Sequence, residues 1–225
     1  MPLRCLDPSG RSIHSFDLSD DEWKALELEN RKTRHLRMPC CSSHVTLKRS
    51  RLGTPFFAHR AVGSCTTAPE TEEHLHLKQM VVMAARAHGW TAQTEATDIT
   101  PSGEPWRADV LATRGKHRVA VEIQWSGQTN DETMRRQERY KASGVRGLWL
   151  LRQPGFPVTR DLPAMCIGGS LEQGFQALIP SHPYMHTRDR NNPDRWHQIV
   201  PMEELLNAAF SRRLRFGRPR SRAVS

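Results

Sequence analysis

Residues 118–125 read RVAVEIQW, and this stretch constrains the fold more than any other part of the chain. Apolar residues occupy every second position from Val119 to Trp125, and a period of two predicts a β-strand with one buried face. Glu122 and Gln124 then lie side by side on the opposite face. Burying a carboxylate and an amide is costly unless both are paired. The strand must therefore supply them with partners or with a ligand.

Further helices and strands are predicted on both sides of this strand. Acids near the start and Gly89 after the end predict a helix at residues 69–88. Turn sequences PSGEP and RGK separate three strands, and Gly144 ends the next helix. The strands are expected at residues 91–97, 106–113 and 118–125, the second helix at 130–143, and a further buried strand at 147–152. This α-β-β-β-α-β order predicts an α/β (α+β) domain, which we assign to residues 67–210.

Residues 1–66 are expected to form a separate N-terminal module. It opens with a short strand-like piece, RSIHSFDL, and a helix for which Ser19 is the N-cap. From residue 38 onward the module reads as short strands and turns, with a hairpin in VTLKRSRLGTPFF. At the other end of the chain the signals weaken after Pro154, until PMEELLNAAFSRRLRF predicts a last helix. Residues 211–225 form a basic, arginine-rich tail that can touch phosphates.

The charge of the chain favours a polyanionic partner. Lys and Arg number 33 against 24 Asp and Glu, a formal net charge of +9. Nucleic acid is the first expected partner and an anionic membrane surface the second. No apolar run is long enough to span a bilayer, and MPLRCLDPSG lacks the apolar stretch of a signal peptide. We therefore expect a cytoplasmic protein that does not bind a membrane. The odd number of cysteines agrees with reduced thiols.

A pair of acids marks the predicted sheet. Asp109 lies on the strand before Glu122, at a spacing that suits antiparallel neighbours in a hairpin. Two carboxylates on adjacent strands form an oxygen-ligand site for Mg²⁺ or Mn²⁺. Gln124 shares the face of Glu122 and can reach the water that attacks a phosphodiester. The alternative is that both acids pair with arginines on an exposed sheet face, namely Arg107, Arg114 or Arg118.

The helix before the strands carries a row of polar side chains. Glu70, His74 and Lys78 are spaced four apart and fall on one face. The alternative explanation for the acids at this end of the helix is that their negative charges interact favourably with the helix dipole. That alternative accounts for single acids but not for a polar row on a helix that must pack against the sheet.

Two residues on the following helix repeat this spacing. Arg136 and Tyr140 are again four apart. Their cation and phenol can contact a substrate phosphate or hold Gln124. The alternatives are a solvated helix face for Arg136 and the edge of the core for Tyr140.

Several ordered motifs resemble a known family. FFAHR, APETEEHLHLK, RADV, VAVEIQWS, RRQERY and GLWLL resemble the competence protein CoiA family of the PD-(D/E)XK nuclease superfamily. The resemblance implies a restriction-endonuclease-like αβββαβ core and metal-dependent cleavage of DNA. It implies catalytic roles for Glu70, His74, Asp109, Glu122, Gln124, Arg136 and Tyr140, with Asp109 and Glu122 as Mg²⁺ or Mn²⁺ ligands. The chain departs from the superfamily at Gln124, where lysine is usual; an amide orients water but adds no charge.

Thiols and imidazoles gather in the N-terminal module. Four side chains among Cys40, Cys41, His44, His59 and Cys65 can form a tetrahedral, structural Zn²⁺ site. Adjacent cysteines rarely bind one ion together, so Cys41, His44, His59 and Cys65 are preferred, with Cys40 as the alternative to Cys41. Zinc would contribute much of the folding energy of so small a module. The other interpretation is buried free thiols and a core histidine. The family resembled here usually has Cys-x2-Cys, so His44 would replace its second cysteine.

The charge, the acidic pair and this resemblance together predict a CoiA-like nuclease. A role in DNA uptake, recombination or defence is what the resemblance implies. The substrate of the nuclease is single- or double-stranded DNA, and recombination or competence proteins are possible partners. Two other classes share the charge and fold: a non-cleaving DNA-binding accessory protein, and an RNA or tRNA processing factor. The pattern leaves strand preference and oligomeric state open. The expected contacts to nucleic acid are Lys48, Arg49, Arg51, Arg60, Lys78, Arg212, Arg213 and Arg215.

Overall fold

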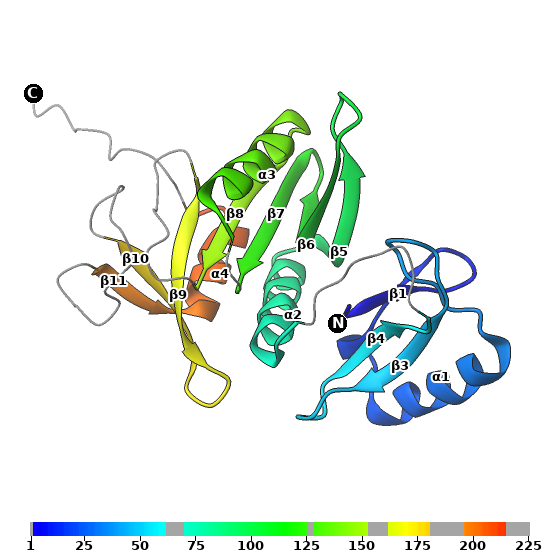
Figure 1. The fold of residues 1–225 in the computed structure, drawn as a ribbon. Coiled ribbons are helices and arrows are strands. Elements are labelled where there is room, and N and C mark those ends of the chain that lie inside the picture. The colour runs from blue at the N-terminus through cyan, green and yellow to red at the C-terminus, as the bar shows by residue number, and fades with distance from the viewer. Residues whose placement is uncertain (1, 62–69, 126–127, 153–161, 181–195, 215–225) are drawn as a thin grey trace, which may run out of the picture.

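The computed structural model describes residues 2–61, 70–125, 128–152, 162–180 and 196–214, and a twisted sheet forms its centre (Figure 1). The seven strands of this sheet follow the order β11-β10-β9-β8-β7-β6-β5. They are β5 (Thr91–Ile99), β6 (Pro105–Arg114), β7 (His117–Gln124), β8 (Arg146–Leu151), β9 (Ala164–Ser170), β10 (Gly174–Pro180) and β11 (Trp196–Pro201). The β5–β6–β7 and β9–β10–β11 groups are antiparallel, whereas β8 runs parallel to both of its neighbours.

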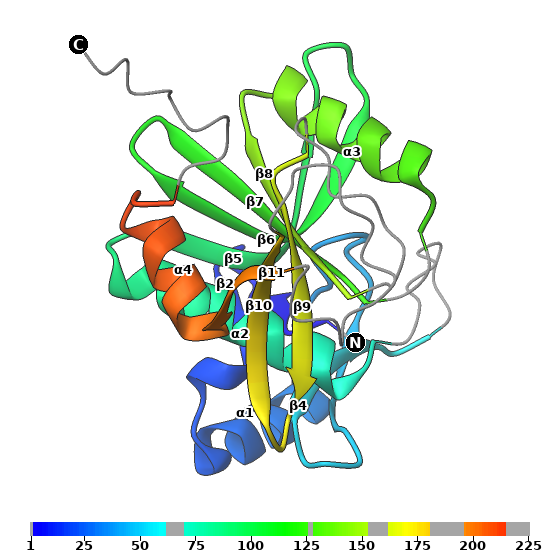
Figure 2. The same cartoon turned by 90° about the vertical axis from the view of Figure 1, so that its left-hand side faces the viewer.

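Helices cover both faces of the sheet. Helices α2 (Glu72–Ala87) and α4 (Met202–Phe210) lie on one face and α3 (Asn130–Ala142) lies on the other (Figure 2). The run α2–β5–β6–β7–α3–β8 confirms the predicted element order. Helix α2 starts later than predicted because the side chain of Thr71 caps it, accepting the N–H of His74 at 3.4 Å. In the described part of the chain, no helix combines the length and apolar character needed to cross a membrane.

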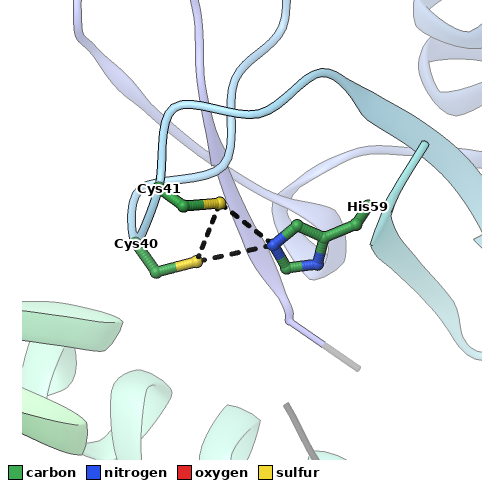
Figure 3. Close-up of side chains that lie close together, drawn as sticks. All are labelled: Cys40, Cys41 and His59. Atoms are coloured by element: carbon green, nitrogen blue, oxygen red, sulfur yellow. Dashed lines mark hydrogen bonds between the residues drawn. The ribbon is translucent and has the colours of Figure 1, made fainter. Parts of the chain in front are cut away.

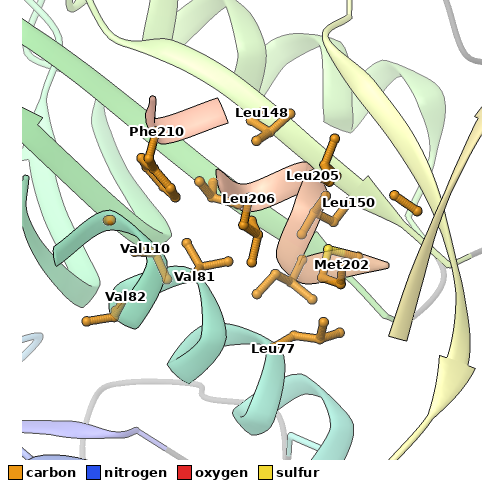
Figure 4. Close-up of a cluster of buried hydrophobic side chains, with 14 of the residues drawn as sticks. Leu77, Val81, Val82, Val110, Leu148, Leu150, Met202, Leu205, Leu206 and Phe210 are labelled. Carbon is orange, nitrogen blue, oxygen red and sulfur yellow. The ribbon is translucent and has the colours of Figure 1, made fainter. Parts of the chain in front are cut away.

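The larger core lies between the sheet and the α2–α4 layer (Figure 4). Leu77 and Val81 of α2 meet Leu205 and Phe210 of α4 over Val110 of β6. Each such side chain stabilises the fold by roughly 1.5–3 kcal/mol when it is fully buried. The amphipathic spacing of these two helices is therefore what attaches them to the sheet.

A smaller core forms under α3, and it depends on one glycine. Tyr140 of α3 packs against Trp106 and Trp149 of the sheet. A Cβ atom at Gly147 would lie 2.1 Å from Oε1 of Gln137. Glycine therefore permits Gln137 to approach and to accept the indole N–H of Trp149 at 2.8 Å.

The N-terminal module has its own core and packs beside α2 and β5 (Figure 1). Its elements are β1 (Arg4–Leu6), β2 (Ser12–His14), α1 (Asp20–Thr33), β3 (Val45–Arg49) and β4 (Pro55–His59). The predicted Ser19 cap is confirmed as a capping box with Glu22, and β3 and β4 form the predicted hairpin. The Arg4 guanidinium donates to the carbonyls of Thr94 at 2.7 Å and Glu95 at 3.0 Å, which joins β1 to β5. The predicted module boundary after residue 66 lies outside the described residues.

Candidate functional site

Three predicted site residues meet where the start of α2 faces β6. Ligand atoms of Glu70, His74 and Asp109 all lie within 4.8 Å of one another. Nε2 of His74 is 3.4 Å from Oδ2 of Asp109. His74 lies in the first turn of α2, whereas Glu70 directly precedes the helix cap and lies outside the helix, so the helix places His74 and the segment before the cap brings Glu70 to it. The cluster is mostly buried and joins two carboxylates to one imidazole.

Asp109 is held in its ionised form. Burial opposes ionisation, but His74, Lys78 and the backbone N–H of Ile123 together hold the pKa of Asp109 well below its usual range. The N–H of Ile123 donates to Oδ2 of Asp109 at 2.9 Å. A carboxylate that stays charged is a suitable ligand for a hard cation.

Glu122 lies beside this cluster on the neighbouring strand. The antiparallel register pairs Val110 with Val121, which places Asp109 and Glu122 next to each other at the end of the ladder. Glu122 is 1% exposed, and its ligand atoms do not join the three-residue group. Burial raises the pKa of Glu122 to about 7; the carboxylate of Asp109 adds to the rise while Arg136 opposes it. The two acids thus influence each other electrostatically, but Glu122 does not share the ligand cluster with Asp109 as the predicted pair of cation ligands would.

Arg136 and Tyr140 hold Glu122. The guanidinium of Arg136 and the hydroxyl of Tyr140 each donate to one of its carboxylate oxygens. Burial lowers the pKa of Arg136, but the charge of Glu122 outweighs it and raises that pKa above its ordinary value. Tyr140 is 1% exposed, so it belongs to the core as well as to the site. Gln124 follows two residues after Glu122 on the same strand, is also buried, and pairs with Leu151 of β8.

Two of the arginines considered as alternative partners of the acids bind elsewhere. Arg118 donates to Asp98 at 2.5 Å, and Arg114 donates to the carbonyl of His88 at 2.9 Å. The backbone carbonyl oxygen of Arg107 lies 3.0 Å from the hydroxyl of Tyr140, which shares its single proton between this oxygen and Glu122. Surface pairing with Arg114 and Arg118 therefore does not explain Asp109 and Glu122.

Lys78, expected among the DNA contacts, is instead fully buried, which corrects that prediction. Its Nζ donates to both oxygens of Glu70, at 2.8 and 3.0 Å, and to Oε1 of Glu95 at 2.7 Å. An ammonium enclosed in this way does not reach a phosphate in solution. Glu95 was not identified from the sequence. The available signal was a lone acid in TAQTEAT, a strand that is otherwise small and neutral.

The thiol cluster forms in the N-terminal module from Cys40, Cys41 and His59 (Figure 3). The two Sγ atoms are 3.7 Å apart, and Nε2 of His59 is 3.7 Å from Cys40 Sγ and 3.2 Å from Cys41 Sγ. Zn–S bonds of about 2.3 Å and Zn–N bonds of about 2.0–2.1 Å place tetrahedral ligand atoms roughly 3.5–3.8 Å apart. Two of the three separations lie in this range and the third is slightly shorter, so this donor set fits zinc.

The membership of this cluster differs from the preferred set. Cys40 and Cys41 both point toward His59, because they lie in a turn that the N–H of Ser42 closes on the carbonyl of Met38 at 2.9 Å. A turn presents neighbouring side chains to one side, unlike a strand. His44 lies apart, and its Nδ1 is 2.7 Å from the carbonyl oxygen of Arg34. The predicted ligand Cys65 lies outside the described residues.

The remaining basic residues lie at two surfaces. The basic residues of the N-terminal module that were predicted to contact DNA are exposed around the β3–β4 hairpin. One of them, Arg49, forms an ion pair with Asp20 at 2.6 Å. Arg212 and Arg213 are exposed after α4, and Arg212 contacts Nε2 of His117 at 3.2 Å. Arg215 lies outside the described residues. The exposed residues at the hairpin are Lys48, Arg49, Arg51 and Arg60.

Comparison with known proteins places this site in a family context. Residues 70–160 match the family described as competence protein CoiA, nuclease-like domain. Competence protein CoiA of Bacillus subtilis (strain 168) is 28% identical over 128 residues, which cover 53% of this chain. The matched part spans only about a third of that relative, 32% of its length. The match to a crystal structure described as protein of unknown function AF1548 has 17% identity and a TM-score of 0.29, and it covers 36% of this chain and 47% of that one.

The family match begins at Glu70 and contains every residue of the acidic cluster, together with Glu122 and the two residues that hold it. The resemblance to the CoiA-like family is therefore confirmed, and it centres on the nuclease-like domain.

Proposed function

We propose that this chain is a metal-dependent nuclease that hydrolyses DNA phosphodiesters in DNA uptake, recombination or defence. The observation that carries the proposal is the convergence of Glu70, His74 and Asp109 beside the buried Glu122. The α2–β5–β6–β7–α3–β8 order and the nuclease-like family match support a restriction-endonuclease-like core.

The residues of the cluster fit a divalent cation in chemistry and in charge. Carboxylate oxygens with one imidazole nitrogen suit Mn²⁺, and the carboxylates suit Mg²⁺. The carboxylates of Glu70, Glu95 and Asp109 and the ammonium of Lys78 leave a formal charge of −2, which one divalent cation neutralises. A bound Mg²⁺ or Mn²⁺ would polarise the phosphate and lower the pKa of a coordinated water. Glu70, His74 and Asp109 would hold it, and Glu122, which was predicted as a ligand together with Asp109, would be the fourth.

The other residues orient the reacting groups. Glu122 has a pKa of about 7 without a cation, so binding a cation would release its proton at neutral pH. Arg136 and Tyr140 keep its carboxylate in place. Gln124, on the same strand face as Glu122, orients the water that attacks phosphorus as the P–O ester bond breaks.

The N-terminal module is assigned a structural Zn²⁺. Cys40, Cys41 and His59 supply three ligands with suitable separations, and Cys65 is the predicted fourth. The exposed cations around the β3–β4 hairpin then give the module a surface for the DNA backbone.

A second candidate is a DNA-binding accessory protein that does not cleave and that acts in recombination. Two observations favour it. Gln124 stands where lysine is usual in the PD-(D/E)XK superfamily that the chain resembles, and both oxygens of Glu122 are engaged by Arg136 and Tyr140. In an enzyme, Glu122 would either release one of these two hydrogen bonds to bind the cation or act while both are in place.

The test is incubation of the purified chain with labelled single- and double-stranded DNA in Mg²⁺, Mn²⁺ or EDTA. Asp109→Asn is expected to abolish cleavage, because it removes a charged ligand while nearly preserving shape. Asp98→Asn is the matched control, since Asp98 lies on the adjacent strand and pairs with Arg118. Equal cleavage by the Asp109 variant and the wild type would refute the active-site assignment. DNA binding without cleavage in any metal would favour the accessory protein.

A further inference from the structure

A buried lysine lies beneath the predicted cation ligands. Lys78 is fully buried, and its Nζ contacts both oxygens of Glu70 and one oxygen of Glu95. A buried ammonium is strongly unfavourable unless it is paired and hydrogen-bonded. Two carboxylates satisfy that requirement, and only one of them, Glu70, belongs to the cation cluster, by which we mean Glu70, His74 and Asp109.

Glu95 is fixed from several directions. Its φ is +48°, which is uncommon for a residue other than glycine, although Thr94 and Ala96 on either side keep their pairing with β6. The N–H of Leu3 approaches Oε1 of Glu95 at 3.4 Å. Arg4 donates to the carbonyl of Glu95 and to that of the preceding residue. Leu3 and Arg4, at the start of the N-terminal module, therefore hold Glu95 in place behind Lys78.

Glu70 has less support from its own backbone. It precedes the helix cap Thr71 and lies outside α2, so the helical hydrogen bonds do not fix it. Contact with Lys78 through both oxygens restrains the carboxylate of Glu70 directly. We infer that Lys78 and Glu95 are positioning residues: Glu95 anchors Lys78, and Lys78 holds the carboxylate of Glu70 toward His74 and Asp109. The inference rests on the proposed function, since it takes Glu70 as a cation ligand.

The direction of the effect separates positioning from simple electrostatics. Lys78 carries a positive charge near the cation, so charge alone predicts tighter cation binding when the lysine is removed. Positioning predicts weaker binding, because Glu70 loses its restraint. Replacing residues that orient metal ligands typically weakens metal affinity about 10–100-fold.

The perturbation is the double variant Lys78→Met with Glu95→Gln. It removes one positive and one negative charge, so the formal charge of the cluster is unchanged. It also avoids leaving the carboxylate of Glu95 buried without its cation, and the amide that replaces this carboxylate retains an oxygen to accept the N–H of Leu3. Glu72→Gln, a partly exposed position in the first turn of α2, is the control for a lost charge nearby.

The measurement is Mn²⁺ affinity of the full chain, by calorimetry and by electron paramagnetic resonance. The double variant is expected to bind Mn²⁺ about tenfold more weakly or worse. When Lys78→Met and Glu95→Gln are added to Glu70→Gln, the Mn²⁺ affinity is expected to fall no further than in Glu70→Gln alone, because both residues act through Glu70. The single variant Glu95→Gln retains the buried lysine and replaces the double variant in this test if the double variant does not fold. Its loss of Mn²⁺ affinity is likewise expected to disappear in the presence of Glu70→Gln.

Wild-type affinity in the double variant overturns the inference. An equal loss with and without Glu70→Gln also overturns it, since that pattern indicates general loosening of the site. Failure of the proposed function has a different signature: the wild type binds no Mn²⁺, or Asp109→Asn leaves its affinity unchanged.

Discussion

Replacing Tyr140 by phenylalanine is expected to raise the pKa of Glu122 further. The hydroxyl of Tyr140 donates to the carboxylate of Glu122 and so favours its ionised form. Phenylalanine retains the ring that packs 5.2 Å from Trp106 and 6.4 Å from Trp149, measured between ring centroids. The substitution therefore removes the hydrogen bond and leaves the packing of the smaller core in place.

The size of the shift follows from the energy of that bond. A hydrogen bond to a charged group contributes about 1.5–3 kcal/mol, and one pKa unit corresponds to about 1.36 kcal/mol. The pKa of Glu122, about 7 in the wild type, is expected to rise by about one to two units. The assay is a titration of the metal-free chain by infrared spectroscopy of the carboxyl band. Glu122→Gln identifies the band that belongs to this residue.

Stability gives an independent measure of the same shift. Because folding raises the pKa of Glu122 from its ordinary 4.5, its ionisation favours the unfolded chain. Its contribution to stability is complete below pH 4.5 and is lost as the pH rises to about 7, by roughly 3 kcal/mol. In Tyr140→Phe the loss is expected to continue to about pH 8–9. A pKa that stays unchanged or falls in this variant would refute the assigned role of the hydroxyl.

Three further predictions concern the other features. Cys41→Ser or His59→Ala is expected to lower bound zinc and destabilise the module, and elemental analysis that finds no zinc in wild type kept from chelators would contradict this. Deleting residues 211–225 is expected to weaken DNA binding and reduce its dependence on salt concentration; identical salt titrations would exclude a role for the tail. Gln124→Ala is expected to slow cleavage on the order of a hundredfold, whereas Gln124→Lys retains or raises the rate; equal rates in all three proteins would show that the amide does not orient water.

Local patterns in the sequence were sufficient for the elements that carry the site. Alternation in RVAVEIQW predicted β7, and the same period predicted which face Glu122 shares with Gln124. Spacing by four predicted that Glu70, His74 and Lys78 lie on one face of a helix. His74 and Lys78 do lie on α2, whereas Glu70 lies before the cap Thr71 and meets them from outside the helix. Such predictions succeed because strand and helix periods depend on backbone geometry alone. The strands β9, β10 and β11 were not predicted, since short segments near Pro and Gly give little periodic signal and depend on pairing with β8 and with each other.

What each side chain contacts depended on segments distant in the chain. The spacing alone could not predict that Lys78 is buried, because one of the carboxylates that pair with it belongs to Glu95 on the distant strand β5, which in turn contacts Leu3. The thiol cluster contains Cys40 in place of the predicted His44, because a turn directs the side chains of both adjacent cysteines toward His59. The sequence by itself determined the order of the elements from α2 to β8 and the strand face that Glu122 shares with Gln124, because these follow from local backbone periodicity. Only the tertiary structure decided which charges pair with which, because those partners are brought together by packing between distant segments.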